Sequence, residues 1–204
     1  MSAIQTMEVK LTSATPLLMH NGRLANPDDK YVRRMSLLHT DKKRKGADKD
    51  AIRAELARVE WEGGLYHSET ESGGDDFGAY LPNPWIRKML IEAARLTRSG
   101  KQVERAVTVF GHRIKLEHDG PRDIEHMWES EDHLDQRMVT VGRSKVVRTR
   151  PIFRKWTALV KVGFSTEVMN HDDLFRFFEQ GGAYIGMGDG RGILGLGRFE
   201  VSAF

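Results

Sequence analysis

Eight glycines crowd the C-terminal part of the chain, between residues 181 and 197. Glycine weakens both helices and strands, so no regular element is expected to cross this stretch. It must form a loop between a helical pattern at 170–180 and a final strand at 198–204. Consecutive backbone N–H groups in such a loop can form an anion-binding concavity, to which arginines would add charged hydrogen bonds. The candidate anion-binding residues are Gly186, Gly188, Gly190, Arg191, Gly192 and Arg198.

The segments on either side of these glycines decide whether they form a known nucleotide-binding motif. Residues 190–195 fit the Gly-x-Gly-x-x-Gly dinucleotide motif by letter. They follow a helical pattern and precede a strand, whereas that motif follows a strand and opens a helix. The Gly-Lys-Ser/Thr ending of a phosphate-binding P-loop does not occur in this stretch. The sequence therefore predicts no cofactor, and a tightly packed turn that binds no ligand stays open as the alternative.

Charged residues are segregated along the chain. Residues 137–161 hold eight cations and no acid, whereas residues 117–135 hold eight acids and one arginine. Such segregation predicts a basic groove for a polyanion and an acidic surface elsewhere; two solvated faces without a partner are the alternative. The basic candidates, which include a second run at 42–45, are Arg33, Arg34, Lys42, Lys43, Arg44, Lys45, Arg143, Lys145, Arg148, Arg150, Arg154 and Lys155.

Two of these arginines have a spacing that suits phosphates. Arg148 and Arg150 lie two residues apart, so on a strand they share one face at about 6.6 Å. That separation is comparable with the phosphate spacing of an extended single strand. Phe153 and Trp156 stand among cations, where aromatic rings can stack on bases. Both rings can equally belong to the core, and for Trp156, at the start of an apolar strand, the core is favoured.

The order of patterns predicts an α+β fold, a ferredoxin-like or RRM-like core with an antiparallel sheet, helices on one face and large insertions. Asp48 is a predicted N-cap of one helix, and Asn83, followed by Pro84, of another. A basic inserted segment is expected at about 20–82 and an acidic insertion at about 117–137. Strands are expected at 7–14, 103–110, 114–116, 138–150, 156–164 and 198–204, and helices at 48–63, 83–100 and 170–180.

Other kinds of site have weak signals. The loop after the first strand offers His20, Asn21 and Arg23 as candidate nucleic-acid contacts. No metal site is expected, because His126 and His133 are seven residues apart and no His-Glu-x-x-His motif occurs. Cysteine is absent, which excludes disulfides and thiolate ligands. Residues 1–10 lack a signal-peptide pattern and no apolar run could span a membrane, so a cytoplasmic protein of a bacterial or phage-infected cell is expected.

Both ends of the chain resemble one family. The ending Gly186-Met-Gly188-Asp-Gly190-Arg191, followed by 195–201 (Gly-Leu-Gly-Arg-Phe-Glu-Val), resembles the C-terminal glycine-rich loop and strand of the RAMP superfamily. These are the repeat-associated proteins of CRISPR effectors. The opening strand and the following Pro-Leu-Leu-Met-His-Asn-Gly of 16–22 resemble the start of their backbone subunits, whose fold is a modified RRM. The chain is also similar to stand-alone members carried by phages and prophages.

The resemblance implies a role and partners. Members bind single-stranded RNA or DNA along its backbone, so the loop His20–Arg23 would approach the strand and residues 33–45 would act as a basic thumb or finger. Copies would stack head to tail into a helical filament, a contact that does not close. CRISPR-type or phage proteins are further implied partners. Some members cleave RNA with a histidine, and His20 is then the candidate.

These observations predict one domain, residues 1–204, that binds single-stranded nucleic acid of many sequences without cutting it. Two alternatives stay open. One is a metal-independent RNA-processing endonuclease that uses His20, and the other is a phage protein-interaction component that mimics a CRISPR subunit.

Overall fold

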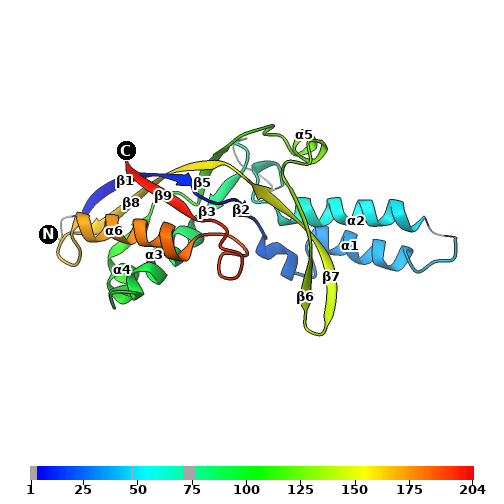
Figure 1. The fold of residues 1–204 in the computed structure, drawn as a ribbon, viewed down its shortest axis with the longest axis horizontal. Helices are drawn as coiled ribbons and strands as arrows, with labels where there is room; N and C mark the ends of the chain where they lie inside the picture. Colours follow the sequence, from blue (N-terminus) through cyan, green and yellow to red (C-terminus); the bar gives the residue numbers. More distant parts are fainter. Residues whose placement is uncertain (1–3, 47, 71–76) are drawn as a thin grey trace. The chain divides into compact units, whose positions relative to one another are not determined.

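The computed structural model describes residues 4–46, 48–70 and 77–204. The chain forms two compact units (Figure 1). Unit 1 contains residues 1–17, 77–119 and 153–204, and unit 2 contains residues 18–76 and 120–152. Unit 2 is drawn from the regions where the sequence places insertions, and it also includes residues up to Ile152.

Unit 1 is built on an antiparallel sheet with the strand order β3-β5-β8-β1-β9, and β4 also pairs with β8. The longest pairing joins β1 and β8, from Ile4 opposite Ser165 to Thr12 opposite Thr157. Buried and exposed residues alternate along β1, as expected for a sheet with one face on the core. The strands are β1 (Ile4–Ser13), β3 (Tyr80–Pro82), β4 (Val107–Val109), β5 (Arg113–His118), β8 (Trp156–Ser165) and β9 (Phe199–Ala203).

Helices α3 (Asn83–Arg95) and α6 (His171–Gln180) lie on the same side of this sheet (Figure 1). In chain order the unit runs through β1, α3, β4 with β5, β8, α6 and β9, which is the βαββαβ order of a ferredoxin-like fold. The predicted α+β class, with an antiparallel sheet and helices on one face, is therefore confirmed.

Both helices begin near their predicted starts, but their caps differ. Asn170 accepts a hydrogen bond from the N–H of Asp173 at 2.7 Å, which is the N-cap expected for α6. Asn83 is not the N-cap of α3, because Pro82 occupies that position. The Asn83 amide instead donates to the carbonyl of Val109 at 2.8 Å. Asn83 therefore ties the start of α3 to β4.

Two predicted strands are wrong in part. Residues 103–106 belong to helix α4 (Gly100–Ala106), and of the predicted strand only β4 (Val107–Val109) forms. The side chain of Val103 is buried, but it lies on the buried side of a helix and not on a strand. Residues 138–150 are not one strand but most of a hairpin, β6 (Leu134–Val141) and β7 (Ser144–Phe153). The chain reverses at Gly142, whose φ of +60° is a left-handed value that glycine adopts without strain.

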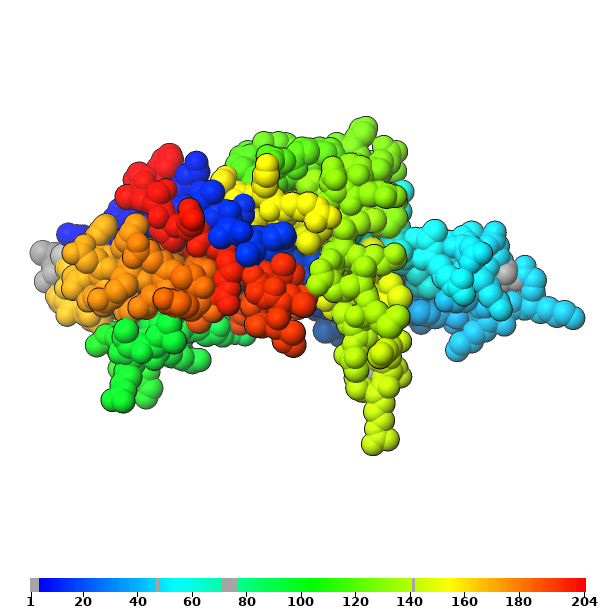
Figure 2. Space-filling model, viewed as in Figure 1, coloured from blue at the N-terminus to red at the C-terminus, as the bar shows by residue number. Residues whose placement is uncertain are grey.

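Unit 2 combines this hairpin with helices. Residues 30–41, part of the predicted basic insertion for which no helix was expected, form helix α1 (Lys30–Asp41), whose N-cap Asp29 accepts from the N–H of Tyr31 at 2.9 Å. Helix α2 (Lys49–Gly64) begins after Asp48, its predicted N-cap. The two helices lie side by side (Figure 1), and the hairpin forms a narrow projection in Figure 2. Short elements complete the chain: β2 (Leu17–Leu18), α5 (Ile124–Glu129), 3-10 turns at Gly22–Ala25 and Ser68–Thr70, and a π-helical turn at Gly181–Ile185.

The glycine-rich loop packs tightly against the rest of unit 1. A Cβ added at Gly182 would lie 2.1 Å from the carbonyl oxygen of Phe199, and one at Gly197 would lie 1.9 Å from that of Met187. The N–H of Gly197 donates to the carbonyl of Pro16 at 2.7 Å, which joins the loop to the segment after β1. Packing therefore demands glycine at positions 182 and 197, whether or not the loop binds an anion.

Replacing Gly197 with alanine should destabilise the protein. Its φ is +69°, and the clash with Met187 adds to the strain, so G197A is expected to lower the free energy of unfolding by roughly 3 kcal/mol. Gly192→Ala is the matched control, because a Cβ there meets nothing within 4 Å. Urea denaturation measures both, and equal effects would contradict the packing explanation.

Candidate nucleic-acid interface

Unit 2 contains a hollow of about 660 Å³ that we call the hairpin groove. Its helical wall follows the periodicity of α1 and α2, in which residues three or four apart share a face. That wall consists of Met35, His39 and Lys42 from α1 and its C-cap, and Arg53, Leu56, Ala57 and Glu60 from α2.

The other wall of the hairpin groove comes from β6 and β7. It consists of Gln136, Val146, Val147, Arg148 and Thr149. Val147 lies directly opposite Met138 across the hairpin, and their side chains are 56% and 65% exposed. Cross-strand partners share a face, so these two form an aliphatic strip that faces water. The hairpin groove therefore has apolar side chains on both walls.

A buried carboxylate joins the two walls. Glu60, 8% exposed, accepts a hydrogen bond from Arg148 Nη1 at 2.7 Å and another from the N–H of Thr149 at 2.9 Å. The next residue, Trp61, is fully buried and donates from Nε1 to the carbonyl of His133 at 2.9 Å. These bonds fix α2 against β7 and the chain that leads into β6, and so fix the width of the hairpin groove.

The cations of the hairpin groove differ in how they are engaged. Lys42 forms no hydrogen bond or ion pair through its side chain with the described part of the chain. Arg53 pairs with Asp50 at 2.8 Å, but both are exposed, so this pair adds little stability and can exchange. At the hairpin turn, Arg143 and Lys145 are exposed and likewise make no such bond to the residues that the structure describes.

The remaining predicted cations of unit 2 lie around the helices. Lys43 and Lys45 are exposed beyond the end of α1, and Arg150 is half-buried on β7. Three others are held in exposed ion pairs, which solvent screens. These pairs are Arg33 with Asp28, Arg34 with Glu55, and Arg44 with Asp41.

The loop after the first strand is mainly a structural connection. Asn21 is 6% exposed, and its amide donates to the carbonyl of Leu65 at 2.9 Å while its Oδ1 accepts from the N–H of Arg23 at 3.1 Å. Arg23 Nη1 donates to the carbonyl of Thr70 at 3.1 Å. Within this predicted set, His20 is the exposed side chain. The polar groups of Asn21 are therefore engaged inside unit 2.

The predicted residues of unit 1 form a separate set. Arg191 Nη2 lies 3.2 Å from both carboxylate oxygens of Glu92, and Arg198 is half-buried with its Nη1 fully enclosed. Arg154 and Lys155 are exposed in the turn between β7 and β8. The glycine positions among the candidates, at 186, 188, 190 and 192, lie in the same loop as Arg191.

Two aromatic candidates belong to the core. Phe153 and Trp156 are 0% and 2% exposed, so the base-stacking role considered for them is wrong. Phe153 packs edge-on against His118 at 4.8 Å between ring centroids, and Trp156 Nε1 donates to the carbonyl of Thr15 at 3.2 Å. Between the two rings, Arg154 and Lys155 occupy the exposed positions of the turn from β7 to β8.

The acidic segment of unit 2 packs on α2. Glu125 is hydrogen-bonded by Arg58, and this bond lowers the pKa of the Glu125 carboxyl. The N–H of His126 donates to Asp123 and lowers the pKa of that carboxyl, while the bond to the Asp123 carboxylate raises the pKa of His126. Two acids of this segment, Asp123 and Glu125, are thus occupied as structural partners.

Sequence reasoning missed most of the groove lining. Met35, His39, Arg53, Gln136 and Val147 were not singled out. The signal that could have found the first two is Pro27-Asp28-Asp29, which starts a helix and places residues 35 and 39 on one face. The wall from β6 and β7 exists because the chain reverses at Gly142. Which helix such a hairpin packs against cannot be predicted from a local sequence pattern.

Comparisons with known proteins give no family. No protein-family model matches the sequence, and no curated protein matches it at a significant level. In the part of the chain that the structure describes, no helix has the length and apolar character needed to cross a membrane. Among residues 4–46, 48–70 and 77–204, no three His, Asp or Glu side chains are grouped so that they could hold a metal ion.

Removing the Glu60 carboxylate should loosen the hairpin groove. Glu60→Ala leaves the N–H of Thr149 and the Arg148 guanidinium without their buried acceptor, so unfolding free energy is expected to fall by about 1–3 kcal/mol. Glu55→Ala is the control, because its pair with Arg34 is exposed and should contribute less than about 1 kcal/mol. Chemical denaturation compares them, and an E60A effect no larger than that of E55A would contradict the clamp.

Proposed function

We propose that the protein binds single-stranded nucleic acid, RNA or DNA, in the hairpin groove of unit 2, without cleaving it and with little dependence on sequence. The observation that carries this proposal is the pairing of apolar walls with cationic edges in one hollow of about 660 Å³. Ligand hollows in proteins commonly have volumes of about 300–1,000 Å³, so one or two nucleotide units are a reasonable occupant.

The apolar walls suit the faces of bases. Met35 and Leu56 on the helical side and Val147 on the hairpin side offer aliphatic surface that any base can contact. Such contacts do not read hydrogen-bonding edges, which supports tolerance of sequence. A duplex keeps its bases stacked and paired, and entering an apolar hollow would cost unstacking energy of a few kcal/mol. A single strand avoids most of this cost.

The cationic edges suit phosphates. Lys42 stands at the hairpin groove, and Arg143 and Lys145 stand at the hairpin turn, all without a partner in the described part of the chain. Neutralising each phosphate of a single strand releases counterions, so log Kobs should fall with log salt by about 0.7 per contact. Copies that associate along the strand, as the family resemblance implies, would add cooperativity to the binding curve.

A charge placed on the hairpin wall should weaken binding. Val147→Asp puts a carboxylate between apolar side chains and next to the expected phosphates, so affinity for a labelled oligothymidylate should fall at least tenfold. Val168→Asp is the matched control, because Val168 of unit 1 is also exposed, at 46% against 56%. Fluorescence anisotropy measures both variants. Equal affinities for V147D and V168D would contradict the proposed site.

The same protein tests the absence of cleavage. Labelled RNA incubated with the purified chain and a chelator should stay intact. Cleavage that is present in the wild type and lost in His20→Ala would replace this proposal with the endonuclease alternative. A protein that captures other proteins but no nucleic acid would support the protein-interaction alternative.

A further inference from the structure

The outer face of α3 and α4 in unit 1 is strongly basic. The inner stripe of α3 is buried, so its remaining positions face solvent. Residues 83–106 hold six cations and two acids, a larger excess of positive charge than the net +3 of the entire chain. We call this surface the α3–α4 face; its cations, all exposed, are Arg87, Lys88, Arg95, Arg98, Lys101 and Arg105.

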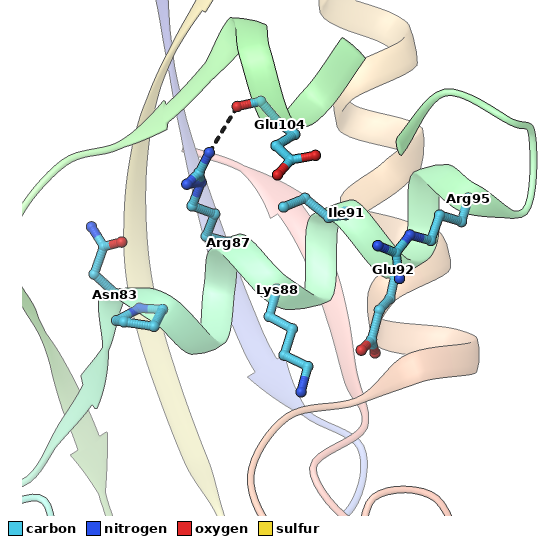
Figure 3. Close-up of a pocket in the computed structure, with 8 residues that line it drawn as sticks. Asn83, Arg87, Lys88, Ile91, Glu92, Arg95 and Glu104 are labelled. Atoms are coloured by element: carbon cyan, nitrogen blue, oxygen red, sulfur yellow. Dashed lines mark hydrogen bonds between the residues drawn. The ribbon is translucent and has the colours of Figure 1, made fainter. Parts of the chain in front are cut away.

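Little of this charge is neutralised within unit 1. Glu92 is paired with Arg191 of the glycine-rich loop at 3.2 Å. Arg87 Nη2 donates to the backbone carbonyl of Glu104 at 2.7 Å, so its charge meets a neutral acceptor (Figure 3). The side chains of the other five cations make no hydrogen bond or ion pair with the residues that the structure describes. A positive potential therefore persists over both helices.

The geometry of the α3–α4 face is fixed. The two helices meet in a tight corner in which the N–H of Ser99 donates to the carbonyl of Ala94 at 2.8 Å and Arg98 has a φ of +63°. Gly100 leaves room for the stem of Arg95, since a Cβ there would lie 2.7 Å from Arg95 Cγ. Tight packing of this corner fixes the backbone from which the cations extend, so the two helices need not rearrange on binding.

A shallow hollow of about 450 Å³ opens on this face (Figure 3). Arg87, Lys88 and Arg95 supply its positive groups, Glu92 and Glu104 its two acids, and Ile91 contributes half-buried apolar surface. Protein partners usually require a larger apolar centre with aromatic anchors. The exposed large apolar side chain among residues 83–106 is Leu96, at 57%. The surface is thus rich in charge and poor in the apolar area that a protein interface needs.

We infer that the α3–α4 face is a second nucleic-acid contact, one that binds the phosphate backbone and reads no base; this inference rests on the proposed function. Four of its six cations are arginines, whose forked guanidinium groups match phosphate oxygens. Helix α3 alone extends about 20 Å at 1.5 Å per residue, long enough to follow several phosphates. This face and the hairpin groove belong to different units, so we expect each to hold its own segment of nucleic acid.

The test uses a double charge reversal, K88E/R95E, in the full chain. Its control is K10E, because Lys10 is exposed on β1 outside the α3–α4 face and, like Lys88 and Arg95, forms no ion pair with the described residues. Titration with a long oligothymidylate at several salt concentrations should give a salt slope shallower by about 1.4 for K88E/R95E, with the control unchanged. Thermal melting should show both variants folded.

Stoichiometry supplies a second readout. Native mass spectrometry with a short oligothymidylate should find two oligonucleotides on the wild-type protein and one on K88E/R95E. An unchanged slope and unchanged stoichiometry in K88E/R95E, with V147D still impaired, would overturn this inference and leave the proposed function standing. Loss of binding in K88E/R95E with V147D unimpaired would overturn the hairpin groove instead. Binding of polyglutamate or anionic vesicles, but not of oligonucleotides, would overturn both.

Discussion

The buried carboxylate of Glu60 is the contact on which the candidate site depends. A carboxylate away from water is costly unless it is hydrogen-bonded, and here Arg148 and the N–H of Thr149 satisfy both oxygens. A two-stranded hairpin is marginal in water by itself, so its position must come from such tertiary bonds. Glu60 holds α2 to β7, and Trp61 holds it to the chain that leads into β6. These bonds set the distance between the two apolar walls of the groove.

Charge has two distinct uses in this chain. Many exposed cations meet acids on their own helices, as Arg53 meets Asp50, and such pairs contribute little. Others form no ion pair with the residues that the structure describes, and these gather at the hairpin turn of unit 2 and on the α3–α4 face of unit 1. In the acidic segment, Glu125 is occupied by Arg58, which belongs to neither of these two surfaces. The small net charge of +3 therefore conceals two locally basic surfaces.

Much of the fold could be predicted from local patterns, and most of the site could not. Alternation marked β1, and Asn170 marked the start of α6, because both signals act within a few residues. Asn83 was wrongly predicted as a cap. Its side-chain amide donates to the carbonyl of Val109, and a contact so far away in sequence leaves no local signal. Of the residues that line the hairpin groove, Lys42 and Arg148 were predicted from the segregation of charge along the sequence. Their apolar neighbours Met35 and Val147 were not, because only tertiary packing brings α1 and β7 together.

Photocrosslinking of a thiouridine-containing oligoribonucleotide, followed by mass spectrometry of the peptides, measures most directly where a strand lies. Crosslinking requires near contact between base and side chain, so it reports the apolar walls and not the phosphates. The account predicts crosslinks in α1, α2 and the hairpin, around Met35, Leu56 and Val147. Crosslinks confined to other peptides at saturating protein, or none at all, would contradict it.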